Sequence, residues 1–391
     1  MYQIRTYNKI SPIGLAKLNP SRYEIDAEGA EPDAILVRSA DLKDLELNPS
    51  LLAIARAGAG YNNIPVERCA EQGIVVFNTP GANANAVKEL ALCALFLASR
   101  DIKGGINWLR EQSEAGVEVS SVVEKGKAQF VGPELMHKTL GVVGLGMIGA
   151  AVANAAVELG MEVWGFDPYL SVASAVRLDN RVHLASDINE LYRRCDYLTL
   201  HTVLSDSTRG MIGMEAVAAM KPGLRLINLA RGEIVNDSAV LAGLESGKVA
   251  VYVTDFPNNR LLANPHVVGL PHLGASTPES ELNCAVMAAR EIREYLETGN
   301  IVNSVNYPSL SMDPSGVQRL CVLHRNIPAM LAKITTLLSN DGINVENMGN
   351  KSRGEYAYTV IDLGSEADDS VIREVEELPG VIRVRSLLPR S

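Results

Sequence analysis

The sequence lacks several features that would assign it to particular classes of protein. It has no apolar run of about 18 residues, so no membrane-spanning segment is expected. Its net charge of −10 lacks the positive excess of general nucleic-acid-binding proteins. Aromatic residues make up only 5%, whereas 47% of residues are hydrophobic and 21% are charged. This composition predicts a globular chain, and 391 residues suffice for two or three domains.

Cysteines are few, odd in number and widely spaced. They are Cys69, Cys93, Cys195, Cys284 and Cys321. Because no CxxC pair occurs, we expect reduced thiols and no metal site. The first residues do not resemble a secretory signal peptide. These absences predict a cytoplasmic protein.

One stretch organises the rest of the chain. Apolar residues at 140–143 predict a buried strand, 150–159 a helix, and 161–166 a second strand. A GxGxxG turn joins the first strand to the helix and consists of Gly144, Gly146 and Gly149. In such turns the first glycine allows a tight bend, the second lets the backbone approach a pyrophosphate, and the third lets the helix pack on the strand. The helix N-terminus offers free N–H groups to the phosphates.

Asp167 follows the second of these strands. It lies 23 residues after Gly144, near the ~20 expected for the acid that binds the ribose hydroxyls. Its charge would repel a 2′-phosphate. The sequence therefore predicts NAD rather than NADP, and the alternative is a glycine-rich structural turn in another α/β protein.

Residues 1–93 are predicted to form a small α/β unit. Three short apolar strands each end in polar or glycine-rich residues: 34–37, 52–55 and 73–77. Ligands of open α/β sheets bind at the carboxyl ends of strands, where Arg38, Arg56 and Asn83 are found. Arginine suits a carboxylate because its guanidinium donates two parallel hydrogen bonds. These side chains are candidates for binding one anion, with surface salt bridges as the alternative.

The middle of the chain is predicted to be a doubly wound sheet. A helical pattern runs from residue 84 to about 108, and the polar stretch 113–130 predicts a loop. Four further strands follow Asp167, at 195–200, 224–228, 249–254 and 267–270. Helical stretches separate most of them, which predicts parallel pairing. Four polar residues fall at the strand ends: Thr202, Arg231, Asp255 and His272.

His272 and Arg231 are the candidates for chemistry. A histidine at a strand end near a nicotinamide can act as general base, because its pKa lies near the operating pH. Arg231 can hold a carboxylate and polarise the reacting oxygen. The alternatives are a structural histidine and a structural ion pair. Beside an NAD-binding turn, the two residues predict hydride transfer between NAD and a hydroxyl carbon.

The C-terminal third is predicted to contain a long helix at 279–296, a linker at 308–316 and a small βαββαβ domain at 317–391.

Over residues 1–305 the sequence resembles the D-isomer-specific 2-hydroxyacid dehydrogenases. Four segments carry the resemblance: 140–149, 228–232, 271–277 and 56–58. It implies an α/β fold with a Rossmann-type NAD-binding domain at 94–284 and a flavodoxin-like substrate domain formed by 1–93 and 285–307. The domain at 317–391 resembles an ACT domain, a fold that commonly binds amino-acid effectors through paired copies.

The resemblance also implies roles for individual residues. Arg231 is similar to the family's catalytic arginine and His272 to its acid/base histidine. The positions implied to bind NAD are Gly144, Gly146, Met147, Ile148, Gly149, Asp167, Thr202, Leu229, Ala230, Asp255, Gly274 and Ala275. The positions implied to bind substrate are Arg38, Arg56, Asn83 and, more weakly, Lys88.

Within the family, the sequence is most similar to members that oxidise D-3-phosphoglycerate to 3-phosphohydroxypyruvate, the first step of L-serine synthesis. The alternatives are a reductase for glyoxylate or hydroxypyruvate and an NAD-sensing, corepressor-like binding protein. A homodimer or homotetramer is expected. In the ACT-like domain, His324, Asn326 and Asn344 are implied contacts for L-serine, although Ala329 stands where serine-inhibited relatives have glycine.

One departure concerns the histidine itself. The family usually has a glutamate shortly after the position of Asp255, where it pairs with the catalytic histidine. Here the chain reads Asp255-Phe-Pro-Asn-Asn-Arg260, without that acid. Such a carboxylate orients the imidazole and stabilises its charged form. Asp255, a water molecule or no partner at all are the alternatives.

Overall fold

The structure is a computed structural model that describes residues 1–388, and these residues form two compact units. The first unit contains Met1–Asn83 and the chain from Pro278 onward, and the second contains Ala84–Thr277. The boundaries predicted from sequence lie near residues 93 and 284. The observed ones fall earlier because α3 (Ala84–Ser99) packs as a whole on the sheet of the second unit, and α12 (Pro278–Thr298) on that of the first.

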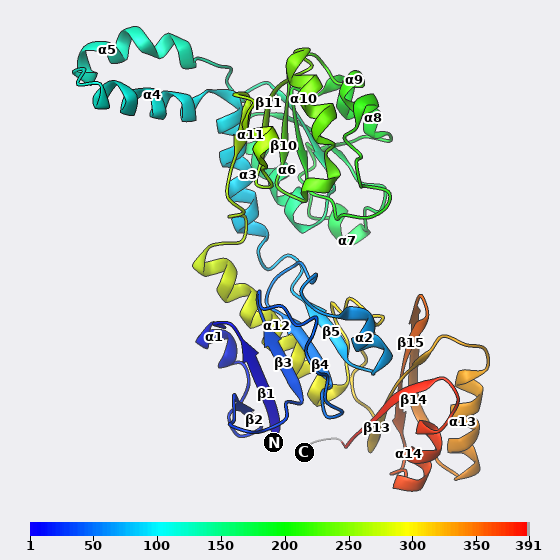
Figure 1. Cartoon of the computed structure of the whole chain (residues 1–391). Helices are drawn as coiled ribbons and strands as arrows, with labels where there is room; N and C mark the ends of the chain where they lie inside the picture. Colours follow the sequence, from blue (N-terminus) through cyan, green and yellow to red (C-terminus); the bar gives the residue numbers. More distant parts are fainter. Residues whose placement is uncertain (389–391) are drawn as a thin grey trace. The chain divides into compact units, whose positions relative to one another are not determined.

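The first unit contains a five-stranded parallel sheet in the order β2-β1-β3-β4-β5 (Figure 1). Its elements are β1 (Tyr2–Tyr7), α1 (Pro12–Leu15), β2 (Tyr23–Ile25), β3 (Ala34–Val37), β4 (Ala53–Arg56), α2 (Val66–Glu71) and β5 (Val75–Asn78). This strand order is flavodoxin-like, as expected. The three predicted strands are confirmed. β1 was not predicted from the sequence, because it contains no apolar run and only Ile4 among its residues is buried.

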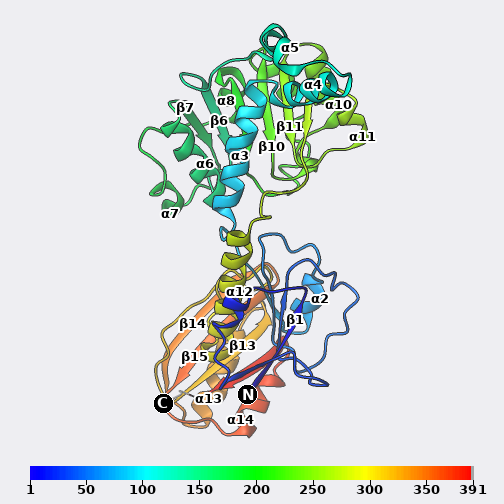
Figure 2. The ribbon, with the colours of Figure 1, turned by 90° about the vertical axis from the view of Figure 1, so that its left-hand side faces the viewer.

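A four-stranded antiparallel sheet in the order β14-β15-β13-β16 completes the first unit. Its elements are β13 (Gln318–Arg325), α13 (Met330–Asn340), β14 (Val345–Arg353), β15 (Tyr356–Leu363), α14 (Asp369–Glu376) and β16 (Val381–Leu387), which confirms the βαββαβ order. α13 and α14 cover one face of the sheet (Figures 1 and 2). Leu320 and Val322 point to this face, whereas the alternate residues Cys321 and Leu323 join the core around α12.

The segment predicted as a linker, 308–316, is held on this sheet by hydrogen bonds. Arg319 binds Asp362 through two contacts of 2.6 and 2.9 Å, and both side chains are buried. Arg319 also donates to the Met312 carbonyl oxygen at 3.1 Å, and Asp362 accepts from the Ser315 N–H at 3.0 Å. The antiparallel sheet is therefore part of the first unit rather than a domain on a loose tether.

The second unit is a seven-stranded parallel sheet in the order β12-β11-β10-β9-β6-β7-β8. The strands are β6 (Thr139–Val143), β7 (Glu162–Phe166), β8 (His183–Leu184), β9 (Tyr197–Leu200), β10 (Leu224–Asn228), β11 (Val249–Thr254) and β12 (Val267–Gly269). The helices include α6 (Met147–Glu158), α8 (Ile188–Arg194), α9 (Met214–Ala219) and α10 (Asp237–Glu245). α3 and α6 cover one face (Figure 2), and α8, α9 and α10 cover the other. The predicted doubly wound sheet is confirmed.

A helical hairpin replaces the loop predicted at 113–130. The helix predicted from residue 84 to 108 ends at Ser99, and Asp101 caps a new helix, α4 (Ile102–Glu114), by accepting a hydrogen bond from the Gly104 N–H. α5 (Val119–Gly126) follows. The two helices project from the second unit (Figure 1), and α4 buries no residue.

No helix among residues 1–388 is long and apolar enough to cross a bilayer, and these residues contain no cluster of side chains arranged to hold a metal ion. All five cysteines are free thiols, and only Cys93 is exposed.

Ala329 adopts a left-handed backbone conformation, with φ of 64° and ψ of 8°. This region costs an L-residue other than glycine about 1 kcal/mol. We expect Ala329→Gly to stabilise the chain by up to about 1 kcal/mol, less the entropy that glycine adds to the unfolded chain. Urea denaturation measures the change in the free energy of unfolding. The control is Ala332→Gly inside α13, which should instead destabilise the chain. A destabilised Ala329→Gly variant would contradict the prediction.

Glu291 makes stability depend on pH. It is buried in α12, and its Oε1 accepts a hydrogen bond from Asn303 at 2.7 Å, while its Oε2 has no partner. Burial raises its pKa from 4.5 to about 8. Between these values the folded state keeps a proton that the unfolded state has lost, so stability falls as pH rises, by up to about 1.4 kcal/mol per unit.

Glu291→Gln should remove this pH dependence and should be more stable than the unmodified chain at pH 9. Denaturation midpoints measured from pH 5 to 9 test this, with the exposed Glu279→Gln, in the same helix, as control. If stability changed with pH in the same way in Glu291→Gln and in the unmodified chain, Glu291 would not be the source of the pH dependence.

Candidate active site

The glycine turn has the geometry that a dinucleotide requires. Gly144 has a φ of 87°, which an L side chain rarely adopts, and a Cβ there would lie 2.6 Å from the His201 carbonyl oxygen. A Cβ at Gly149 would lie 1.8 Å from the Gly144 carbonyl oxygen, so the helix can pack closely only with glycine. A Cβ at Gly146 would meet no atom within 4 Å. The backbone at Gly146 is therefore open to an approaching phosphate, as the sequence predicted.

Asp167 lies directly beside this turn. Its Oδ2 accepts a hydrogen bond from the Leu145 N–H at 2.9 Å, and its Oδ1 accepts one from the Tyr169 N–H at 2.9 Å. The carboxylate is thus fixed at the carboxyl end of β7, next to the strand that carries the glycines. This is the position from which an acid reaches the ribose hydroxyls of a bound dinucleotide.

The remaining predicted cofactor contacts lie along the same sheet edge. They are Met147 and Ile148 at the start of α6, Thr202 after β9, Leu229 and Ala230 after β10, Asp255 after β11, and Gly274 and Ala275 after β12. The strand order reverses between β6 and β9, and ligands of doubly wound sheets bind at such a switch point. The turn, the acid and the open edge together fit NAD, although the contact of each residue with the cofactor stays a prediction.

His272 is paired with a buried carboxylate. Its Nδ1 lies 3.6 Å from Oδ2 of Asp255, which is an ion-pair distance but too long for a hydrogen bond. The His272 side chain is 57% exposed, whereas that of Asp255 is 1% exposed. The Phe256 ring packs edge-on against the imidazole at 4.8 Å. Of the three alternatives that the sequence left open, this contact favours Asp255 as the carboxylate beside His272, and it leaves Nε2 of His272 free of it.

Asp255 carries a poorly solvated charge. Burial raises the pKa of its carboxyl above the ordinary value, and the charges of His272 and Arg231 act in the opposite direction. Its Oδ1 is buried without a hydrogen-bond partner. A positive charge that forms on His272 during proton transfer would therefore stabilise the Asp255 carboxylate, and the carboxylate would stabilise the imidazolium equally.

Arg231 is exposed and forms no salt bridge with any carboxylate in the described chain, which rejects a structural ion pair. Its Nη1 donates to the Ala230 carbonyl oxygen at 2.7 Å. The Asn228 side chain holds the Arg231 backbone by donating to its carbonyl oxygen at 2.8 Å. Arg231 lies within electrostatic range of Asp255, so Arg231, Asp255 and His272 form one charged group at the strand ends.

His201 follows β9 and is held by hydrogen bonds to its ring and its backbone. Its Nε2 lies 3.0 Å from the Thr199 hydroxyl oxygen, and its backbone N–H donates to the Val143 carbonyl oxygen at 2.7 Å. Burial lowers its pKa to about 4, so it remains neutral at physiological pH.

The predicted anion-binding residues of the first unit gather at the ends of β3 and β4. Val37 pairs in register with Arg56, and Arg38 follows Val37, so the two arginines lie on adjacent strands. Both influence the thiol of Cys284 in α12. A Cβ at Gly58 would lie 2.3 Å from Nη1 of Arg56, so the guanidinium lies over this turn and would have to shift if residue 58 carried a side chain.

The other predicted substrate residues differ in their settings. Asn83 is buried, and its Oδ1 has no hydrogen-bond partner, which suits a residue awaiting a ligand. Lys88 belongs to the second unit, where its Nζ donates to Oδ1 of Asn85 at 2.6 Å. Arg38 forms a salt bridge of 2.6 Å with Glu281, the alternative that the sequence left open.

The predicted effector residues do not converge within one chain. His324 is buried and hydrogen-bonded through both ring nitrogens, to the Arg325 carbonyl oxygen and the Thr359 hydroxyl, both at 2.8 Å. Asn326 lies beyond the Tyr356 end of β15, and Asn344 beyond its Leu363 end. Eight residues of strand separate them, so one serine cannot contact both asparagines of the same chain.

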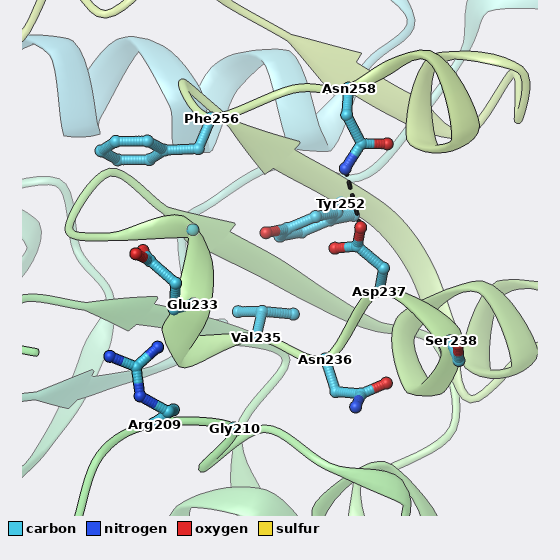
Figure 3. A pocket seen from close by; sticks show the side chains of 11 residues that line it. Arg209, Gly210, Glu233, Val235, Asn236, Asp237, Ser238, Tyr252, Phe256 and Asn258 are labelled. Carbon is cyan, nitrogen blue, oxygen red and sulfur yellow. Dashed lines mark hydrogen bonds between the residues drawn. The ribbon is translucent and has the colours of Figure 1, made fainter. Parts of the chain in front are cut away.

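A pocket of about 510 Å³ is lined by residues that directly follow Arg231 and Asp255 in the chain. Figure 3 shows Arg209, Glu233 and Tyr252 around it, and Asp237 accepting a hydrogen bond from Asn258. None of the residues predicted to bind NAD or substrate lines it. It meets the candidate site through Phe256, whose ring contacts His272, and no motif in the sequence indicated it.

Two curated relatives found by comparison with known sequences carry the same name. The protein is 34% identical over 331 residues to D-3-phosphoglycerate dehydrogenase of Bacillus subtilis (strain 168), a match that covers 80% of this chain and 60% of that one. It is also 34% identical over 323 residues to D-3-phosphoglycerate dehydrogenase of Methanocaldococcus jannaschii, covering 80% and 59%. The chain thus spans less than two thirds of the length of these curated relatives.

Solved structures show the same fold. An NAD⁺-bound 3-phosphoglycerate dehydrogenase of Entamoeba histolytica matches with a TM-score of 0.58 and 25% identity, over 79% of this chain and 99% of that one. A glyoxylate reductase of Paecilomyes thermophila matches with a TM-score of 0.63 and 26% identity, over 78% and 98%. Residues 92–274 match the family described as "D-isomer specific 2-hydroxyacid dehydrogenase, NAD binding domain". This chain therefore carries the NAD-binding domain of the D-isomer specific 2-hydroxyacid dehydrogenases.

Proposed function

We propose that the protein oxidises D-3-phosphoglycerate to 3-phosphohydroxypyruvate with NAD, the first step of L-serine synthesis. The observation that carries the proposal is the group of Arg231, Asp255 and His272 at the strand ends of an NAD-binding domain. The names of the curated relatives support this substrate.

The proposed chemistry follows from the three side chains. Nε2 of His272 takes the proton of the C2 hydroxyl, and the imidazolium that forms is stabilised by Asp255 through Nδ1. Arg231 binds the substrate carboxylate and polarises the C2 oxygen. Bound NAD supplies the hydride acceptor. Asp167 and the N–H groups at the start of α6 would hold it, through its ribose hydroxyls and its pyrophosphate.

Arg38, Arg56 and Asn83 are proposed to bind the phosphate end of the substrate. Two guanidinium groups on adjacent strands suit a dianion, and the partnerless Oδ1 of Asn83 suits a substrate hydroxyl. NADH formation with D-3-phosphoglycerate, compared with unphosphorylated D-glycerate, tests the assignment. Equal rates would favour a general 2-hydroxyacid reductase, and no turnover with either would favour a binding protein.

We further propose that the protein is a cytoplasmic homo-oligomer. The α4–α5 hairpin exposes apolar side chains, including Ile102 and Ile106, which a second copy would cover. Because Asn326 and Asn344 are far apart in one chain, L-serine would need residues of two chains. Sedimentation gives the oligomeric state, and titration calorimetry with L-serine tests the effector.

A further inference from the structure

An ion pair covers one of the proposed anion-binding arginines. Nη2 of Arg38 lies 2.6 Å from Oε1 of Glu281, in the first turn of α12. The two side chains are 38% and 43% exposed. An ion pair this open to solvent contributes little to stability and exchanges readily, so its removal should leave the fold intact.

The surroundings explain why a carboxylate sits there. Arg38 and Arg56 lie on adjacent strands, and both act on Cys284, one turn after Glu281. The Glu281 carboxylate offsets the positive charge of Arg38 at this place.

We propose that Glu281 is a specificity-determining residue, which in the ligand-free chain occupies the place on Arg38 that the phosphate group of the substrate takes. It is thus a built-in competitor. A phosphate displaces it because a dianion binds the Arg38 guanidinium more strongly than one exposed carboxylate does. Glu281 thereby weakens the capture of monoanions and inorganic phosphate on Arg38. This inference rests on the proposed substrate.

The test is Glu281→Gln, with Glu279→Gln as matched control. Both changes remove one negative charge from the first turn of α12, but Glu279 forms no ion pair within the described chain. For Glu281→Gln, KM for D-3-phosphoglycerate should fall about threefold, and inhibition by inorganic phosphate should strengthen similarly. Glu279→Gln should change neither. Equal shifts in both variants, or none in Glu281→Gln, would overturn the proposal.

A second comparison separates this proposal from the choice of substrate. If the unmodified protein does not oxidise D-3-phosphoglycerate, the proposed function fails, yet titration calorimetry with inorganic phosphate still tests Glu281. Glu281→Gln should bind phosphate about threefold more tightly than the unmodified chain. The gain should vanish in an Arg38→Gln background. A gain that survives without Arg38, or equal affinities in the first comparison, would show that Glu281 does not compete for this arginine.

Discussion

Replacing Asp255 with asparagine is expected to lower kcat by about 10²- to 10⁴-fold. Asp255 is the carboxylate at Nδ1 of His272, and asparagine keeps its size but loses the charge that stabilises an imidazolium. Steady-state NADH formation measures the loss. Asp237→Asn is the matched control, because Asp237 starts α10 and bonds Asn258 rather than His272.

The same variant decides between the two roles considered for Asp255. If its main role is contact with NAD, Asp255→Asn will weaken NADH binding and leave kcat nearly intact. If it acts through His272, kcat will fall while the Kd for NADH, measured by fluorescence, changes little. The pH profile gives a third readout. Burial raises the pKa of Asp255. As the pH is lowered, activity should therefore begin to fall at a higher pH than it would with an aspartate of ordinary pKa. Asp255→Asn should remove this acid-side fall in activity.

Replacing Arg319 with alanine is expected to destabilise the first unit by about 3 to 5 kcal/mol. The change leaves the carboxylate of Asp362, which is fully buried, without its charged partner. It also removes hydrogen bonds to Thr298, at the end of α12, and to Met312, so the 308–316 segment should become sensitive to proteases. Urea denaturation and limited proteolysis measure these effects.

Two further variants test the cause of this loss. Arg325→Ala, in the same strand, breaks an exposed pair with Glu355 and should cost about 1 kcal/mol or less. The double variant Arg319→Met/Asp362→Leu should recover most of the stability, because no unpaired charge remains buried. A double variant as unstable as Arg319→Ala would show that the hydrogen bonds of the pair, rather than its charge balance, hold this region.

Local signals predicted most of the fold. The run that became β3 is apolar, the run that became β15 alternates, and both are bounded by polar or glycine residues, so strand type and position follow from sequence. β1 gave no such signal, because its place depends on pairing with β2 and β3 rather than on its own residues. The residues of α5 resemble a loop in sequence because the helix is short, polar and largely unburied.

The candidate site residues could be predicted where each one lies next to a strand that the sequence itself indicates. The glycine turn, Asp167, Arg231 and His272 each adjoin a recognisable strand. The pair of Arg38 and Glu281 was not predictable, because it forms only after the strands and α12 are in place. For His272 the sequence left three alternatives, Asp255, a water molecule or no partner, and the 3.6 Å contact with Asp255 favours the first. His324 shows the converse, since a residue matching an effector position proved to be buried and fully hydrogen-bonded.

The central claim is that Arg231, Asp255 and His272 promote the oxidation of a phosphorylated 2-hydroxy acid by NAD. It is tested most directly by following the absorbance of NADH as it forms. We expect turnover with D-3-phosphoglycerate, a kcat/KM at least about tenfold lower with D-glycerate, and loss of activity in His272→Asn. Turnover of D-glycerate equal to that of D-3-phosphoglycerate, or an active His272→Asn variant, would contradict the claim.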